Sequence, residues 1–267
     1  MDLGLKNQVA LVLASSKGLG LACAKGLYHE GAHVIICSRS KENLLKAKKV
    51  ILESGSINPN ATVENFTVDL NSEQQIKELV DFSLKRFNKV DILVHNAGGP
   101  RSAPAFQITK EDWDNSINLN LFSFIRISRL ILPNMQQQKH GRIIAITSVS
   151  VKQPLDNLVL SNTTRLGVAG YAKTLANEYA KDNILVNVVC PGPNLTDRMK
   201  ELIRTQVETT GISEQEVLNT WVSSIPLGRL GEPEELANLV VFLSSNKASY
   251  ITGTTIQVDG GYVKSAL

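Results

Sequence analysis

The sequence predicts an α/β fold, a single doubly wound (Rossmann) parallel sheet of about seven strands with helices on both faces. Short apolar runs alternate with amphipathic stretches along the whole chain, which is typical of strands joined by helices. Runs such as Val9–Leu13 and Ile184–Cys190 are apolar almost throughout, as strands buried on both faces are. A turn of small residues links the first apolar run to the first amphipathic stretch.

The alternation gives the elements in chain order. Strands are expected at Val9–Leu13, His33–Cys37, Thr62–Val68, Asp91–His95, Arg142–Ser148, Ile184–Cys190 and Thr255–Val258. Helices are expected over Leu19–Glu30, Lys41–Glu53, Ser72–Phe87, Asp112–Gln138, Leu158–Lys181 and Pro233–Leu243. Because proline lacks the N–H that a helix interior needs, we expect a break or kink at Pro133.

The chain reads as one domain, residues 1–267, because no repeat, low-complexity tract or linker divides it. The Pro191-Gly192-Pro193 stop is followed by a mobile, partly helical insertion, Leu195–Ser224, which we expect to cover the site as a substrate lid. Its apolar residues suit a hydrophobic substrate wall and packing onto the domain equally: Met199, Leu202, Ile203, Val207, Val217, Leu218 and Trp221.

Composition argues against several classes of function. The net charge is only +3 and the basic residues are scattered, so no nucleic-acid surface is expected. No secretory signal and no run of 18 apolar residues is present, which indicates a cytoplasmic protein without a membrane span. No metal site is expected, because neither the three cysteines nor the four histidines have ligand spacing.

The turn after the first strand predicts a phosphate site. Small residues between a strand and a helix let the backbone approach a pyrophosphate, and the N–H groups of the first helical turn face it. An ordinary strand–helix connection is the alternative. The turn consists of Ala14, Ser15, Ser16, Lys17, Gly18, Leu19 and Gly20.

The end of the second strand indicates the cofactor. A fold of this kind that prefers NAD carries a carboxylate there for the ribose 2′-hydroxyl. Here Ser38 and Arg39 hold that place, and an arginine can grip a 2′-phosphate that a carboxylate would repel. Lys17 adds a second cation. We therefore predict NADP(H) rather than NAD(H), with a plain pair of surface cations as the alternative.

With these motifs the sequence resembles the short-chain dehydrogenase/reductase family, of the 3-oxoacyl-[acyl-carrier-protein] reductase type. Beyond the phosphate turn, the matching positions in chain order are Asp69-Leu70, Asn96-Ala97-Gly98, Asn120, Ser148, Pro191-Gly192 with Thr196, Gly228–Glu235, Ile251-Thr252-Gly253 and Val258–Gly261. Ala14 replaces a glycine, a change that is tolerable only if the turn needs no positive φ there.

The resemblance implies roles for these positions. Asp69 and Leu70 would contact adenine, and Asn96, Ala97 and Gly98 would lie against the cofactor. The stretch from Pro191 through Asn194 to Thr196 would hold the nicotinamide carboxamide. Asn120 and Ser148 would be the active-site asparagine and serine, and a homotetramer would be the assembly.

One departure stands out. The family uses a Tyr-x-x-x-Lys pair on the helix after the serine, whereas an ungapped count from Ser148 places Ser161 and Arg165 there. Gly167 and Leu175-Ala176 support that register, and no tyrosine of the chain has a lysine four residues later. Residues four apart share a helix face, so Ser161 and Arg165 can both reach the nicotinamide. Arginine can hold ribose hydroxyls and stabilise an alkoxide, but serine is a far weaker acid than tyrosine.

The proton donor therefore stays open between Ser161, a water held by Asn120, Ser148 and Ser161, and the loop residues Asp156 and Lys152. Three functions remain. The first is an NADP(H)-dependent oxidoreductase that interconverts a ketone and a secondary alcohol, on the pattern of a 3-oxoacyl-thioester reductase. The second is an NADP(H)-binding pseudoenzyme or sensor. The third is another reaction on the same cofactor, such as dehydration or isomerisation.

Overall fold

The computed structural model describes residues 1–265 and contains a seven-stranded, fully parallel sheet in the order β3-β2-β1-β4-β5-β6-β7. The strands are β1 (Val9–Val12), β2 (His33–Ser38), β3 (Val63–Thr67), β4 (Ile92–His95), β5 (Gly141–Ile146), β6 (Ile184–Pro191) and β7 (Thr255–Val258). The strands from β1 to β3 are added toward one edge of the sheet, and those from β4 to β7 are added toward the other, so the order switches between β1 and β4. In open α/β sheets that switch point forms a crevice at the carboxyl ends of the strands. The expected fold class is therefore confirmed.

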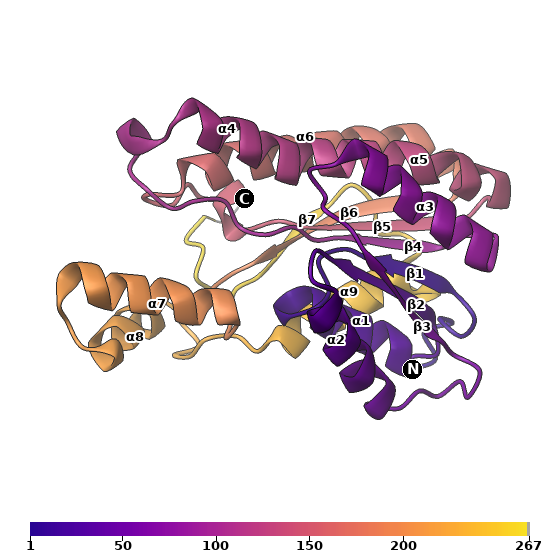
Figure 1. The fold of residues 1–267 in the computed structure, drawn as a ribbon, viewed down its shortest axis with the longest axis horizontal. Helices are drawn as coiled ribbons and strands as arrows, with labels where there is room; N and C mark the ends of the chain where they lie inside the picture. The colour runs from indigo at the N-terminus through magenta and orange to yellow at the C-terminus, as the bar shows by residue number, and fades with distance from the viewer. Residues whose placement is uncertain (266–267) are drawn as a thin grey trace.

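Helices cover both faces of the sheet (Figure 1). One layer holds α3 (Glu73–Phe87), α4 (Lys110–Ser116), α5 (Ser123–Gln138) and α6 (Val159–Tyr179), and the other holds α1 (Gly18–His29), α2 (Lys41–Glu53) and α9 (Pro233–Ser244). Alternate side chains of each strand enter opposite cores, so the two layers build two apolar cores. Short 3-10 turns complete the path at Ala105–Gln107, Val149–Val151, Ala180–Asp182 and Asn246–Ala248.

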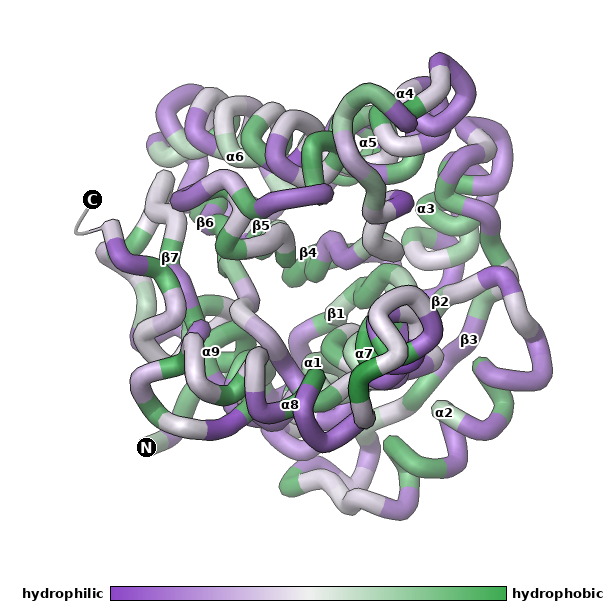
Figure 2. The backbone as a smooth tube through the Cα atoms, turned by 90° about the vertical axis from the view of Figure 1, so that its left-hand side faces the viewer, coloured by the Kyte–Doolittle hydropathy of each residue, from purple (hydrophilic) through white to green (hydrophobic). Residues whose placement is uncertain are grey.

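The insertion after β6 forms two helices, α7 (Asp197–Thr210) and α8 (Glu214–Ser223), that lie apart from both layers (Figure 1). Seen along the sheet, they lie over the ends of the strands (Figure 2). Their apolar faces pack together in a third, smaller core of Met199, Ile203, Val217, Ile225 and Leu230. Ile225 and Leu230 come from the segment after α8, so that segment and the two helices share one small core above the carboxyl edge of the sheet.

Of the expected break or kink at Pro133, the break is wrong, and a kink there stays a prediction. Helix α5 runs through Pro133 to Gln138, and the irregularity comes earlier, in a π-helical segment at Ile117–Phe122 between α4 and α5. A π-helical turn widens the helix by one residue and is often found at functional sites. Here it contains Asn120.

No helix within residues 1–265 is long and apolar enough to cross a bilayer.

Candidate active site

A cavity of about 500 Å³ lies at the carboxyl ends of β1, β4, β5 and β6, beneath α7 and α8. It brings together many of the residues singled out from the sequence. These are Ala14, Lys17, Gly18, Leu19, Asn96, Ala97, Gly98, Ser148, Ser161, Arg165, Pro191, Gly192, Asn194 and Thr196. The phosphate turn and the Ser161–Arg165 helix face thus line one continuous space.

Close packing fixes the shape of the phosphate turn. A Cβ atom at Gly20 would lie 2.6 Å from the carbonyl oxygen of Ala14, so only glycine fits there. Asn96 donates from Nδ2 to the same carbonyl at 3.2 Å, which ties the end of β4 to the turn. The Ser15 hydroxyl is buried, donates to the Val12 carbonyl at 2.7 Å and accepts from the Cys37 amide at 3.0 Å. Ser15 therefore anchors the turn and does not line the cavity.

Ala14 does not meet the condition under which it would replace a glycine without strain, because its backbone has a positive φ. Its φ is +45°, in the left-handed region that favours glycine. A residue with a Cβ atom is strained by roughly 1–2 kcal/mol in that region. The turn therefore has the backbone shape that a glycine would adopt, with an alanine holding it under strain.

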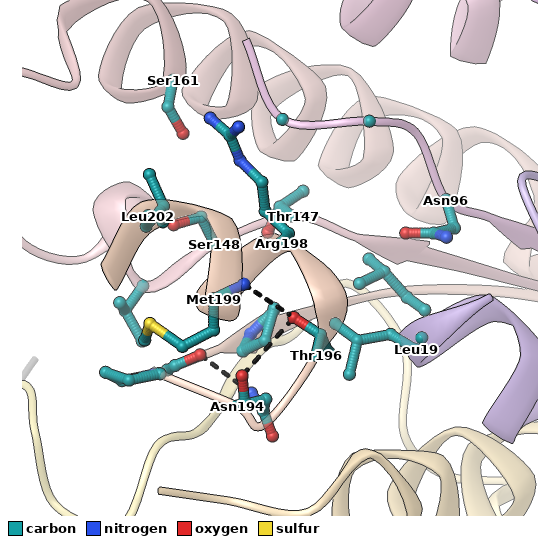
Figure 3. A pocket seen from close by; sticks show the side chains of 18 of the residues that line it. Leu19, Asn96, Thr147, Ser148, Ser161, Asn194, Thr196, Arg198, Met199 and Leu202 are labelled. Carbon is teal, nitrogen blue, oxygen red and sulfur yellow. Dashed lines mark hydrogen bonds between the residues drawn. The ribbon is translucent and has the colours of Figure 1, made fainter. Parts of the chain in front are cut away.

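Ser150 connects two further serines beside the end of β5, Ser148 through its backbone amide and Ser161 through its hydroxyl. Ser148 Oγ accepts from the Ser150 amide at 3.1 Å, and the Ser150 and Ser161 hydroxyls lie 3.1 Å apart. Ser150 and Ser161 are almost fully buried. Ser161 points from α6 into the cavity (Figure 3). Ser150 is a residue that sequence reasoning missed, although the Ser148-x-Ser150 spacing was a signal for it.

Arg165, one turn beyond Ser161 on α6, turns its guanidinium toward β5. Its Nη1 donates to the Thr147 carbonyl at 2.7 Å and to the Ile146 carbonyl at 3.3 Å. No carboxylate within residues 1–265 pairs with it, and burial lowers its pKa to about 10. The group is therefore still a cation at neutral pH, and its remaining N–H groups have no protein acceptor in the part of the chain that the structure describes.

Asn120 lies behind the cavity rather than on its wall. Its Nδ2 donates to the Ser116 carbonyl at 3.2 Å, while its Oδ1 is buried without a partner among residues 1–265. The neighbouring Ser116 and Thr164 hydroxyls lie 3.4 Å apart and join this segment to α6. A buried amide oxygen of this kind suits an ordered water as its partner.

His95 has a packing role. It ends β4, its Nε2 lies 2.9 Å from the Ser123 hydroxyl, and its ring lies 4.9 Å from that of Phe124. Burial lowers the pKa of His95 to about 3, and the charge of Arg165 contributes to that lowering. The imidazole is therefore neutral at physiological pH.

The predicted 2′-phosphate position lies at the same edge of the sheet, outside the cavity wall. Ser38 ends β2, and Arg39 follows it as an exposed side chain without an ion pair among residues 1–265. Asp69 and Leu70 follow β3. Leu70 is buried in the core, and Asp69 accepts from the Asn71 amide at 3.0 Å. The remaining predicted residues that do not line the cavity are Ser16, Gly20 and Asn120.

The stretch after β6 begins the lid. Thr196 caps α7 by accepting from the Met199 amide at 3.3 Å, and Asn194 donates from Nδ2 to the Gly192 carbonyl at 2.8 Å (Figure 3). Lys17 lies 3.8 Å from Asp197 and so connects the phosphate turn to the lid.

The lid contributes to the cavity wall as well as to its own core. Met199, Leu202 and Trp221 line the cavity, whereas Ile203, Val207, Val217 and Leu218 pack within the lid. Arg198 and Tyr262 are further lining residues that the sequence did not single out. The position of Arg198 two residues after the Thr196 cap was the available signal for it.

Comparisons with known proteins agree with this geometry. A family model described as Enoyl-(Acyl carrier protein) reductase matches residues 13–263. The 3-oxoacyl-[acyl-carrier-protein] reductase of Thermotoga maritima is 34% identical over 262 residues, covering 97% of this chain and 99% of the relative. Human dehydrogenase/reductase SDR family member 4 is 32% identical over 258 residues, covering 96% and 88%. The structure of L-sorbose reductase from Gluconobacter frateurii, complexed with NADPH and L-sorbose, superposes with a TM-score of 0.93 at 32% identity, covering 99% of this chain and all of that one.

Proposed function

Because the chain belongs to the short-chain dehydrogenase/reductase family, we propose that it is an NADP(H)-dependent oxidoreductase that interconverts a ketone and a secondary alcohol. The observation that carries this proposal is the single cavity that runs from the phosphate turn to Ser148, Ser161 and Arg165. A dinucleotide that lies along the carboxyl edge of such a sheet brings its nicotinamide to that end of the cavity.

The residues at the edge of the sheet fit NADP(H). Gly18 lines the cavity at the start of α1, where the N-terminus of the helix suits a pyrophosphate. Arg39 is exposed and free of carboxylate partners within residues 1–265, so its guanidinium is available to a 2′-phosphate. Lys17 is a second cation, shared with Asp197 at 3.8 Å. L-sorbose reductase, of the same fold, was solved with NADPH, which supports the same choice here.

We propose that Ser161 and Arg165 occupy the positions of the family's tyrosine and lysine. Both line the cavity from one face of α6, with Ser148 opposite them at the end of β5. Arg165 can stabilise negative charge on a substrate oxygen, because it is buried, keeps its proton at neutral pH and has N–H groups without protein acceptors in residues 1–265. Ser148 can donate a hydrogen bond to the same oxygen.

The proton route would use the hydroxyl pair of Ser161 and Ser150. Hydride transfer is chemistry that NADPH supplies when bound. The substrate oxygen then needs one proton, which the Ser161 hydroxyl can donate. Ser161 can regain a proton from the Ser150 hydroxyl, whose oxygen lies 3.1 Å away. A serine that gives up its proton must regain one, so the pair must connect through water to the bulk solvent, which is the net source of the proton. The unpartnered Oδ1 of Asn120 could hold a water for this purpose.

The test is a fluorescence titration of the purified protein with NADPH and with NADH, followed by NADPH oxidation assays. The panel should hold simple ketones and 3-oxoacyl thioesters, the class named in the Thermotoga maritima relative. We expect tight NADPH binding with turnover of at least one carbonyl. A protein that binds NADPH but turns over no compound of a broad panel would contradict the reductase proposal.

A second candidate, an NADP(H)-binding pseudoenzyme or sensor, is favoured by the way the two replaced side chains are held. The Ser161 hydroxyl already lies within hydrogen-bond distance of Ser150, and Nη1 of Arg165 is committed to two β5 carbonyls. Both side chains therefore already have hydrogen-bond partners within the protein, as they would if their only role were structural. The activity of a restored Tyr-x-x-x-Lys pair, treated in the Discussion, separates the two candidates.

Assembly as a homotetramer is a proposal based on the family, and a cytoplasmic location stays the prediction made from the sequence. Phe122 and Leu166 are about half exposed, at the start of α5 and on α6, and would suit burial between subunits. Sedimentation at micromolar concentration tests the assembly, and a monomer there would contradict it.

A further inference from the structure

Arg198 is the one lid residue that carries a cationic group across the cavity. It lies in the first turn of α7, and its side chain points away from that helix, toward the side of the cavity from which Ser161 comes (Figure 3). A Cβ atom built at Gly99 would lie 3.8 Å from Arg198 Nε. The guanidinium therefore spans from the lid to the loop after β4.

The other charges around the cavity are arranged differently. Lys17 lies by the phosphate turn with Asp197 as its partner, and Arg165 donates to backbone carbonyls at the end of β5. Arg198 is paired at 3.0 Å with Glu201, one turn along the same helix. The side chains of Arg198 and Glu201 are 44% and 65% exposed. Exposed pairs of this kind contribute little, so another carboxylate can readily take the place of Glu201.

Apart from the carboxylates of Asp197 and Glu201, many of the residues that line the cavity are apolar. Leu155 and Leu158 come from the segment before α6, and Met199, Leu202 and Trp221 come from the lid. An arginine at the rim of an apolar cavity suits a ligand that has a hydrocarbon body and an acid group at one end. The guanidinium fork binds a carboxylate through two parallel hydrogen bonds.

We propose that Arg198 selects substrates that carry a free carboxylate, so that this protein acts on oxo acids or hydroxy acids in preference to neutral ketones. This inference rests on the proposed function, since it names the substrate class of the same cavity. The carboxylate displaces Glu201 from Arg198, and the carbonyl carbon then lies toward Ser148 and Ser161. The lid helix α7 closes over the ligand because the bound acid connects Arg198 to the deeper residues.

The experiment compares matched pairs of compounds, straight-chain 2-, 4- and 5-oxo acids and their methyl esters, in NADPH oxidation assays. We expect the wild-type kcat/KM to be about tenfold or more higher for at least one acid than for its ester. Arg198→Gln should remove that preference by raising KM for the acid, with little change for the ester, because one charge-assisted contact is lost. Glu201→Gln should lower KM for the acid, because Arg198 loses its competing partner.

Arg204→Gln is the matched control, since Arg204 is an exposed arginine on the same helix that does not line the cavity. Turnover of esters without any preference for acids, or an acid preference that survives Arg198→Gln, overturns the inference and leaves the proposed function intact. Charged 3-oxoacyl-CoA thioesters, compared with neutral short thioesters, form a further arm. If Arg198→Gln affects only the CoA compounds, a phosphate is the ligand and the carboxylate assignment is wrong.

A binding measurement decides the inference even if no compound is turned over. Calorimetric titration of each oxo acid into the protein, with and without NADP⁺, should give about tenfold weaker binding for Arg198→Gln than for wild type. Acid binding that is equal in the two proteins contradicts the role of Arg198. Absence of turnover together with Arg198-dependent acid binding contradicts only the reductase proposal.

Discussion

The hydroxyl oxygens of Ser150 and Ser161 lie 3.1 Å apart, joining the turn after β5 to the cavity-facing side of α6. The same turn holds Ser148, whose hydroxyl accepts from the Ser150 amide. Ser150 thus stands between the two serines that face the cavity. It is a positioning residue, since it does not itself line the cavity.

Replacing Ser150 with alanine removes its hydroxyl. The hydrogen bond that its backbone N–H donates to the Ser148 hydroxyl stays in place. We expect kcat for carbonyl reduction to fall about tenfold, with KM and NADPH affinity nearly unchanged, because Ser161 loses one hydrogen-bond partner. Ser150→Thr should recover most of the rate. Ser83→Ala removes an equally buried serine hydroxyl far from the cavity and serves as the control. An equal loss of kcat in both alanine variants would mean a general structural effect.

Restoring the family pair by Ser161→Tyr with Arg165→Lys distinguishes a reductase from a pseudoenzyme. A positioned acid contributes about 10²–10⁴ in rate. If the natural site works, the double variant should change kcat by less than about tenfold. A gain of two orders of magnitude or more, in a chain that is otherwise inactive, would favour the sensor. Ser161→Phe with Arg165→Lys fills the same space without the hydroxyl, and NADPH titration checks that each variant binds the cofactor.

Arg39→Asp should reverse the cofactor preference. A carboxylate in that place repels the 2′-phosphate and can accept from a ribose 2′-hydroxyl. We expect the Kd for NADPH to rise about 100-fold, as for the loss and reversal of a phosphate-binding charge, while the Kd for NADH stays level or falls. Lys85→Asp makes the same charge change on α3, at an exposed position. Unchanged NADPH affinity in Arg39→Asp would mean that Arg39 does not contact the 2′-phosphate.

Ala14→Gly should stabilise the protein. The left-handed φ of +45° strains alanine but not glycine. Since glycine also loses more backbone freedom on folding, the net gain should be about 0.5–1 kcal/mol, visible as a rise in Tm of a few degrees. Ala24→Gly in the regular helix α1 should have the opposite sign. A lower Tm for Ala14→Gly would show that the turn relaxes around alanine.

Buried His95 should make stability fall as the solution becomes acidic. Its pKa is lowered from 6.5 to about 3 in the folded protein, so between these values the unfolded chain binds more protons. The stability due to neutral His95 is complete above pH 6.5 and is lost as the pH falls toward 3, by at most about 1.4 kcal/mol per pH unit. Tm measured from pH 7.5 to 5 should therefore fall less for His95→Gln than for wild type. For the control His29→Gln, at an exposed histidine, Tm should change with pH by the same amount as in wild type.

The resemblance to the family singled out most of the residues that line the cavity, and the strand pattern explains why they meet, because parallel strands bring their carboxyl ends to one edge. That rule correctly gathers the phosphate turn, Asn96, Ser148 and Pro191, although these lie far apart in the chain. The helical repeat likewise predicts a shared helix face for Ser161 and Arg165, and both residues line the cavity. Such residues are positioned by elements whose periodicity is visible in the sequence.

Features that depend on packing were not predictable in the same way. The φ of Ala14 is +45°, and nothing in the local sequence signals a left-handed alanine. The direction of the Arg165 guanidinium depends on which β5 carbonyls lie within reach. The place of Arg198 in the cavity wall depends on how the lid helices fold onto the sheet.

The π-helical segment at Ile117–Phe122 holds one residue more than a regular helical turn does. Removing one residue there would return the segment to α-helical geometry and leave α4 and α5 in phase with one another. The contacts inside the segment would change instead, because the wide turn places Asn120 against the Ser116 carbonyl, next to the Ser116–Thr164 contact with α6. A single-residue deletion would therefore keep the long helix continuous and displace Asn120 from its present position.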